Sequence, residues 1–123
     1  MRATDKIIAL SDLGRWRAGQ RAAGRRVVVT NGCFDLLHAG HVTYLEAAAA
    51  QGDILLVGVN DDAGGRELKG PTRPLNHEDD RALVLAALGC VGAATIFHGA
   101  TALEFLQVAQ PDVYVKGGDY SLE

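Results

Sequence analysis

Residues 27–41 read VVVTNGCFDLLHAGH, and this stretch decides the fold. Three valines and a threonine open it and predict a buried strand, which Asn31 and Gly32 then interrupt. His38 and His41 follow, three residues apart, where the next helix is expected to begin. A strand, a sharp break and a helix start are the parts of a phosphate site, because a helix amino end offers amide groups to an anion.

Length, charge and cysteine content limit what the chain can be. Its 123 residues, 48% of them hydrophobic, predict a single domain with a covering helix within residues 1–25 and a core at 26–120. A net charge of −3 argues against nucleic acid as the partner and favours a small anionic ligand in a local pocket. Two cysteines without CxxC spacing and no membrane-length apolar run predict a cytoplasmic protein with no membrane partner.

Helical and strand patterns alternate along the chain. Helices are expected at residues 11–23, 41–51, 77–88 and 101–109, the third capped by Asn76, and strands at 26–31, 54–59, 93–97 and 113–116. Residues 60–76, rich in glycine, proline and charge, are expected to form a long functional loop. This alternation predicts an open α/β sheet, mostly parallel, with its ligand at the carboxyl ends of the strands where the strand order reverses.

The chemistry centres on residues 38–41, HAGH, because the chain contains neither a GxGxxG nor a P-loop motif after its first predicted strand. Gly40 would let the backbone approach a ligand, and His38 and His41 could donate to one polyphosphate. From the residues alone, other interpretations stay open. The two histidines could form a zinc half-site with Cys33 and Asp35, Cys33 could be a nucleophile paired with His38, or the histidines could be ordinary surface residues.

The run GCFDLLHAGH resembles the signature of the HxGH nucleotidyltransferase superfamily, in its cytidylyltransferase-like branch. LLVGVNDDA at 55–63, LKGPTRPLN at 68–76, EDDRALVLAAL at 78–88 and PDVYVKGGDY at 111–120 extend the resemblance to the heptose 1-phosphate adenylyltransferases, over about residues 26–120. The resemblance implies a Rossmann-like open parallel sheet with helices on both faces and a possible homodimer. It implies that ATP, with Mg²⁺, and a sugar 1-phosphate, D-glycero-β-D-manno-heptose 1-phosphate, give ADP-heptose and pyrophosphate for lipopolysaccharide or related glycans.

Two other functions remain compatible with HAGH, since nothing in these four residues selects the base or the acceptor. One is a cytidylyltransferase acting on a polyol phosphate such as glycerol 3-phosphate. The other is a nucleotide-binding module without turnover.

The resemblance also implies roles for individual residues. The expected catalytic residues are His38, His41 and Lys69. The expected nucleotide-binding residues are Thr30, Asn31, Gly32, Cys33, Phe34, Gly40, Lys116, Gly117 and Asp119. The expected substrate-binding residues are Asp35, Asn60, Asp61, Arg73 and Arg81. No residue is assigned to a metal, and His77 and His98 are expected to be solvated without a role.

Bland explanations stand beside several of these assignments. Asn60 and Asp61 could simply form a turn, Lys69 could be a solvated charge, and Arg81 could pair with Glu78 or Asp79. The sequence departs from the resembled family at Gly64 and Gly65, which should loosen the loop, and at its end. The family continues into a fifth strand and a Ser-Thr segment that closes on the phosphates, so a longer protein or a partner subunit is expected to supply that wall.

Overall fold

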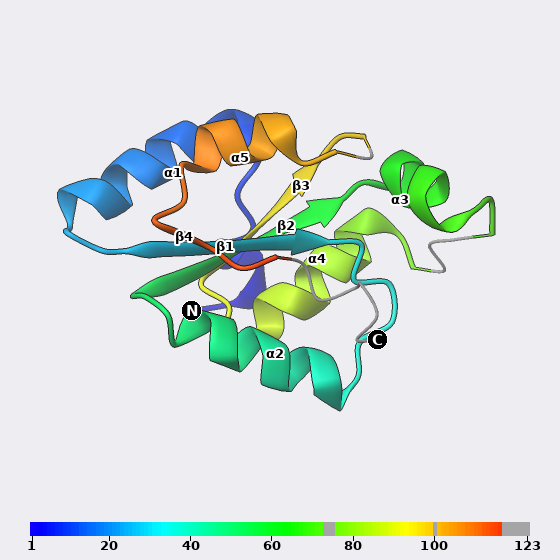
Figure 1. The fold of residues 1–123 in the computed structure, drawn as a ribbon, viewed down its shortest axis with the longest axis horizontal. Helices are drawn as coiled ribbons and strands as arrows, with labels where there is room; N and C mark the ends of the chain where they lie inside the picture. Colours follow the sequence, from blue (N-terminus) through cyan, green and yellow to red (C-terminus); the bar gives the residue numbers. More distant parts are fainter. Residues whose placement is uncertain (73–75, 100, 117–123) are drawn as a thin grey trace.

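The computed structural model describes residues 1–72, 76–99 and 101–116 (Figure 1). A short 3₁₀ turn, η1, spans Ala3–Lys6 and precedes the alternating elements. In chain order these are α1 (Leu10–Ala22), β1 (Val27–Gly32), α2 (Ala39–Ala49), β2 (Ile54–Asn60), α3 (Asp62–Lys69), α4 (Glu78–Ala87), β3 (Ala93–Phe97), α5 (Leu103–Ala109) and β4 (Val113–Tyr114).

The four strands form one parallel sheet in the order β3-β2-β1-β4. Val27 lies opposite Ile54 and Gly32 opposite Val59, so β1 is paired with β2 along its whole length. The chain moves outward from β1 through β2 to β3, then returns to place β4 on the other side of β1. The strand order therefore reverses between β1 and β4, and the carboxyl ends of these two strands border the crevice where ligands bind in sheets of this kind.

Helices cover both faces of the sheet, α1 and α5 on one and α2 and α4 on the other (Figure 1). The alternating side chains of β1 explain this arrangement, because successive strand residues point to opposite faces. Val27 and Val29 pack with Leu13 and Phe105 on the α1–α5 side. Val28 packs on the other side, among residues of α2 and α4. Burying each such side chain stabilises the fold by roughly 1.5–3 kcal/mol. The predicted open parallel sheet with helices on both faces is confirmed.

The segment predicted to be a loop contains a helix, α3, so that part of the prediction was wrong. Asp61 caps it, since its Oδ1 accepts a hydrogen bond from the Gly64 amide at 2.8 Å. The expectation that Gly64 loosens the segment was also wrong. Gly64 is buried, and a Cβ at this position would overlap the carbonyl of Gly99. The glycine is needed for close packing between the start of α3 and the end of β3.

Most predicted element boundaries differ from the structure by one or two residues, and the differences at α4, α2 and β4 have the following details. His77, rather than Asn76, occupies the N-cap of α4. Asn76 instead donates its amide to Asp35 Oδ1 and its side-chain nitrogen to the Asp35 carbonyl, both at 2.9 Å. Helix α2 begins at Ala39, two residues early, because His38 caps it. Strand β4 has two residues, where four were expected.

Candidate functional site

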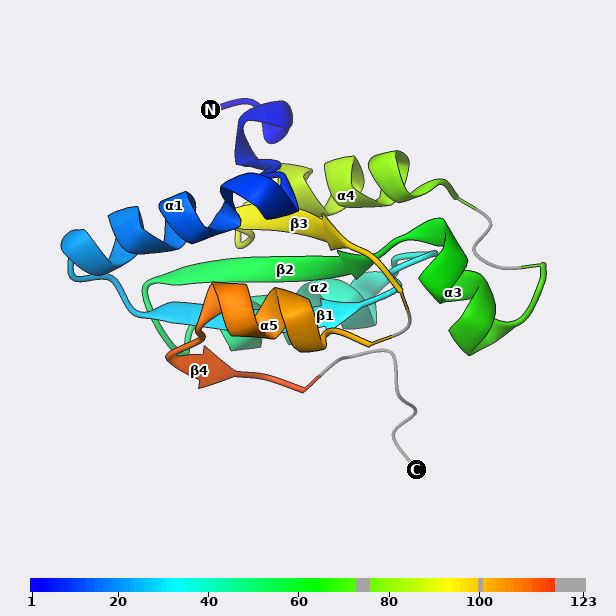
Figure 2. The same cartoon turned by 90° about the horizontal axis from the view of Figure 1, so that it is seen from above.

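The carboxyl edge of the sheet, where all four strands end, gathers most of the residues expected to act. The turn between β1 and α2 lies at this edge, and α3 lies beyond the end of β2 in two perpendicular views (Figures 1 and 2). The end of β4 meets the end of β1 here, since Tyr114 donates its hydroxyl to Asn31 Oδ1. These expected residues therefore lie at the edge where the strand order reverses.

His38 and His41 together cap the amino end of α2, and we call this pair the histidine cap. The Gly40 amide donates to His38 Nδ1 at 3.0 Å. The His38 amide donates to His41 Nδ1 at 3.2 Å. This reciprocal arrangement places one histidine at the N-cap and the other at the third helical position. The two imidazole rings lie 4.3 Å apart between centroids, so both face the same small volume at the helix start.

These hydrogen bonds decide which ring nitrogen carries the proton. A nitrogen that accepts a hydrogen bond from an amide has no proton of its own, so each Nδ1 is bare. The proton of each neutral imidazole is then on Nε2, which is the nitrogen that can donate to a ligand. The backbone thus orients both rings and fixes their tautomer, as hydrogen bonds to the second nitrogen do in other histidine sites.

Gly40 allows the His38 ring to fold back over the first turn of α2. A Cβ on Gly40 would lie 2.7 Å from His38 Cε1 and 3.0 Å from Nδ1. Glycine is therefore required here by the position of the histidine ring. The reason expected from the sequence was a different one, the approach of backbone to a ligand.

The strand-end turn before the histidine cap is strained and buried. Phe34 has a φ of 51° and is 2% exposed, and a positive φ is costly for a bulky residue. Its ring meets the His41 ring edge-on, with centroids 6.2 Å apart. Cys33 is 1% exposed. A thiol so enclosed is poorly placed to be a nucleophile, because reactive cysteines are partly exposed. Gly32 is buried beside them.

Two tyrosines to which the sequence assigned no role connect β1 to β4 and to the residues that follow it. Thr30 is fully buried, and its hydroxyl is 2.8 Å from the Tyr44 hydroxyl. Tyr44 also donates to the Lys116 carbonyl at 2.6 Å. Tyr114 binds Asn31 as described above. Both hydroxyls therefore tie β1 to the last part of the described chain. Tyr44 follows the histidine cap by one helical turn, and this spacing was the signal available in the sequence.

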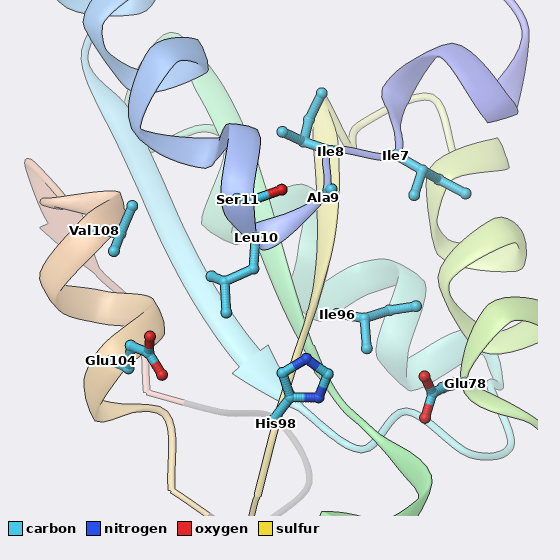
Figure 3. A pocket seen from close by; sticks show the side chains of 10 residues that line it. All are labelled: Ile7, Ile8, Ala9, Leu10, Ser11, Glu78, Ile96, His98, Glu104 and Val108. Carbon is cyan, nitrogen blue, oxygen red and sulfur yellow. The ribbon is translucent and has the colours of Figure 1, made fainter.

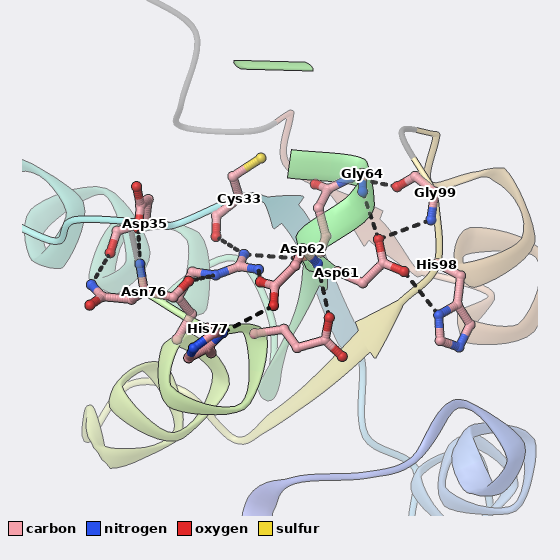
Figure 4. A network of polar contacts seen from close by, with 12 residues as sticks. Cys33, Asp35, Asp61, Asp62, Gly64, Asn76, His77, His98 and Gly99 are labelled. Carbon is pink, nitrogen blue, oxygen red and sulfur yellow. Dashed lines mark hydrogen bonds and ion pairs between the residues drawn. The ribbon is translucent and has the colours of Figure 1, made fainter. Parts of the chain in front are cut away.

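Arg81 is the centre of a buried polar network that includes Cys33, Asp62 and Asn76, whose positions Figure 4 shows. Its side chain is 0% exposed and forms an ion pair with Asp62 at 2.8 Å. The ion pair with Glu78 or Asp79, the alternative to the expected substrate-binding role of Arg81, is not what the structure shows. Glu78 instead accepts a hydrogen bond from the Asp62 amide at 2.9 Å. The guanidinium also donates to the carbonyl of Asn60, which is itself 2% exposed.

Asp61 and Asp62 carry the strongest electrostatic signals near this network. Burial alone raises the pKa of Asp61, but hydrogen bonds from the Gly64 and Gly99 amides and from His98 outweigh it and lower the pKa. At Asp62, burial likewise raises the pKa, but the hydrogen bonds from Arg81 and His77 outweigh it, so the pKa is lowered. The side chains of His98 and His77 are 76% and 86% exposed, yet His98 lies against Asp61 and His77 against Asp62.

The remaining expected residues fall into two groups. Lys69 is exposed at the last position of α3, and Gly70 follows it with a φ of 103°. Lys116 is exposed beyond β4. Arg73, Gly117 and Asp119 lie outside the described residues, so their predicted roles stay predictions.

A separate groove of about 710 Å³ lies beside β3, and neither histidine of the cap is among the residues that line it (Figure 3). Ile7, Leu10, Ile96 and Val108 contribute apolar surface to it. Its charged lining includes Glu78 and Glu104, which would repel a polyphosphate. The groove is therefore unsuited to a nucleotide.

Neither a metal centre nor a membrane span is found in the described parts of the chain. Residues 1–72, 76–99 and 101–116 contain no group of three His, Cys, Asp or Glu side chains arranged to hold a metal ion. Over the same residues, no helix has the length and apolar character needed to cross a membrane.

Comparisons with known proteins agree with this geometry. A family model described as cytidylyltransferase-like matches residues 29–123. The bifunctional protein HldE of Trichlorobacter lovleyi is 55% identical over 106 residues, which are 86% of this chain and 22% of that protein. HldE of Pseudomonas aeruginosa is 58% identical over 103 residues, 84% of this chain and 22% of that protein. The chain thus spans less than a quarter of the length of these relatives.

A solved structure gives the same result for the fold. The lipopolysaccharide core biosynthesis protein from Thermoplasma volcanium superposes with a TM-score of 0.72 at 30% identity, covering 81% of this chain and 80% of that one. The family match covers most of the chain and includes the histidine cap. The chain therefore belongs to the cytidylyltransferase-like family.

Proposed function

We propose that this chain is a nucleotidyltransferase that transfers the adenylyl group of ATP to D-glycero-β-D-manno-heptose 1-phosphate. The products are pyrophosphate and ADP-heptose, which is used for lipopolysaccharide or a related glycan. The observation that carries the proposal is the histidine cap, two imidazoles oriented by backbone amides at a helix start beside the reversal of strand order. The extended sequence resemblance and the similarity to a lipopolysaccharide core biosynthesis protein support the choice of a lipopolysaccharide sugar. A cytoplasmic location and a homodimer, both expected from the sequence, belong to the same proposal.

The reaction is a displacement at the α-phosphorus of ATP. An oxygen of the sugar phosphate attacks this phosphorus, and the bond to the bridging oxygen of the β-phosphate breaks, so that pyrophosphate leaves with the electron pair. The attacking oxygen is already anionic near neutral pH, so no strong general base is required. The protein must align the two substrates and stabilise the negative charge that develops on the transferring and leaving groups.

The described residues suit these two tasks. The Nε2 donors of His38 and His41 would bind α- and β-phosphate oxygens, together with the amino end of α2. Lys69, at the end of α3, and Arg73 would close on the leaving pyrophosphate as cations. Asn31 and Lys116 border the crevice in which the nucleoside would lie. Asp35 is placed at the turn before the histidine cap, where the acceptor would enter.

Mg²⁺ enters this proposal with ATP, as part of the substrate. Magnesium usually keeps several waters and binds substrate phosphates with one or two carboxylates, so a dedicated cage of protein side chains is not required. A single carboxylate near the carboxyl edge, such as that of Asp35, would supply one ligand to such an ion. The ion would neutralise phosphate charge, while the histidine cap and Lys69 hold the phosphates in place.

One assay tests the assignment and its competitors. The protein with Mg²⁺ is incubated with ATP or CTP and with heptose 1-phosphate or glycerol 3-phosphate, and pyrophosphate release is followed. Release only with ATP and heptose 1-phosphate is the expected result. Release with CTP and the polyol phosphate would assign the chain as a polyol-phosphate cytidylyltransferase. Nucleotide binding without release under any pairing would make it a binding module.

A further inference from the structure

Arg81 makes more polar contacts within the protein than a surface phosphate-binding arginine would. Its Nη1 donates to the Cys33 carbonyl at 2.6 Å and to the Asn60 carbonyl at 2.8 Å. Its Nε donates to the Asn76 carbonyl at 3.0 Å, and its Nη2 to Asp62 Oδ1 at 2.8 Å. The side chain is 0% exposed. A guanidinium enclosed in this way is committed to groups of the protein itself.

The four acceptors belong to the segments that position the proposed catalytic groups (Figure 4). Cys33 lies in the turn that leads to His38, and Asn60 ends β2. Asp62 begins α3, the helix that ends at Lys69. The loop at Asn76 in turn holds Asp35 by two hydrogen bonds. One side chain therefore connects the histidine turn, the helix of the cationic clamp and the loop beside the expected acceptor.

We propose that Arg81 is a positioning residue for the transfer reaction: its buried guanidinium fixes the turn before His38 and the start of α3 relative to each other, so that the histidine cap and Lys69 act on one nucleotide. This inference rests on the proposed function for its catalytic consequence. Arg81 itself does not touch the substrate. Its effect on turnover passes through the two segments that it joins.

An arginine is needed for this task because of its shape. Its planar group presents five donors in fixed directions, and here at least four hydrogen bonds leave it toward four residues. A lysine would keep the charge and a contact with Asp62. Its single ammonium group would not reach the carbonyls of Cys33, Asn60 and Asn76 at the same time.

The chain offers a matched control, Arg17, a second buried arginine at a distance from the site. Arg17 is 4% exposed, donates its Nε to the Gln110 carbonyl at 3.0 Å and pairs with Asp112 at 3.2 Å. Asp112 also accepts the amide of Val27, which begins β1, so this ion pair lies at the amino end of the sheet. Arg17→Lys and Arg81→Lys each weaken one buried ion pair, and only the second lies beside the histidine cap.

The kinetic test compares these two variants with the wild-type chain. We expect Arg81→Lys to lower kcat by about tenfold or more while KM for ATP changes by less than about threefold, since misplacement by a fraction of an ångström slows the transfer step. Arg17→Lys should lower Tm and leave kcat within about twofold. Equal losses of kcat in both variants, or unchanged kcat in Arg81→Lys, would overturn the proposal.

A second readout does not depend on the identity of the acceptor. Amide hydrogen exchange should become faster in residues 31–41 and 60–69 of Arg81→Lys and stay unchanged there in Arg17→Lys. Unchanged amide exchange in Arg81→Lys would refute the positioning role, whether or not the wild-type chain turns over heptose 1-phosphate. Absence of turnover by the wild-type chain with heptose 1-phosphate would refute the proposed function. If Arg81→Lys does not fold, Asp62→Asn replaces it in both experiments. We expect kcat to fall and amide exchange in residues 31–41 and 60–69 to become faster in this variant too, by smaller amounts.

Discussion

Replacing Gly40 with alanine should stop the reaction without unfolding the protein. The added Cβ would lie 2.7 Å from His38 Cε1 and 3.0 Å from His38 Nδ1. Carbon atoms in contact settle at about 3.5–4.0 Å, so the ring must move by roughly 1 Å. A displacement of that size in a catalytic group costs on the order of 100-fold in turnover. The φ of Gly40 is not positive, so the backbone itself tolerates alanine.

The folded state should tolerate the same change. The hydrogen bond from the Gly40 amide to His38 Nδ1 is lost or weakened, at a cost of about 1 kcal/mol. Alanine in place of glycine in a helix raises the free energy of unfolding by up to about 1 kcal/mol. The two effects nearly cancel. We therefore expect the free energy of unfolding to change by less than about 1 kcal/mol while kcat falls by roughly one to two orders of magnitude.

The assay measures pyrophosphate release and urea unfolding on Gly40→Ala and on a control, Gly19→Ala. Gly19 lies in α1, and a Cβ there would meet nothing within 4 Å. The control should be as stable as the wild-type chain or up to about 1 kcal/mol more stable, with unchanged kcat. A Gly40→Ala variant whose kcat stays within about threefold of wild type would refute the argument that the glycine serves the histidine ring.

Three further predictions concern single groups around the site. His41→Ala should lower kcat far more than it weakens ATP binding measured by calorimetry, because its contact strengthens as charge develops; equal losses would contradict that role. Tyr44→Phe removes the hydroxyl partner of Thr30 and should cost about 1 kcal/mol in urea unfolding, and no loss would show that this bond is not stabilising. Because the pKa values of Asp61 and Asp62 are lowered in the folded state, the two carboxylates should stabilise the fold fully above their ordinary pKa of 3.8, and this stabilisation should be lost as the pH falls below that value. Urea unfolding midpoints that stay constant from about pH 5 to about pH 2.5 would contradict this.

The sequence predicted the strands and the histidine turn because their signals are local. A run of β-branched residues, a break and two histidines at helical spacing lie within one short stretch, and the structure places them as β1 and the start of α2. Helix α3 was missed for a physical reason. Its sequence, DAGGRELK, has two glycines and little apolar content, so its existence depends on the Asp61 cap and on contact with Gly99 across the chain.

The Arg81 network could not be predicted for a related reason. An ion pair on a helix is expected from residues three or four positions away, which is why Glu78 seemed a natural partner. The observed partner, Asp62, is nineteen residues away in the chain. It meets Arg81 because β2 ends, and α4 begins, at the same edge of the sheet. Carbonyl acceptors such as that of Cys33 leave no trace in a sequence, since every residue has one.

The spacing of HAGH follows from the geometry of a helix start. The side chain at the third helical position can reach back to the amide of the N-cap residue, which is what His41 does with the His38 amide, while the His38 ring accepts the amide of the second helical residue, Gly40. The ring at the N-cap folds over the second helical residue, which therefore has to be Gly40. Ala39, between them, makes no such demand on its side chain. In this chain, two histidines that are both held by backbone amides at the same helix start have their ring orientations set by the protein itself, so the fold places them in advance for binding a phosphate.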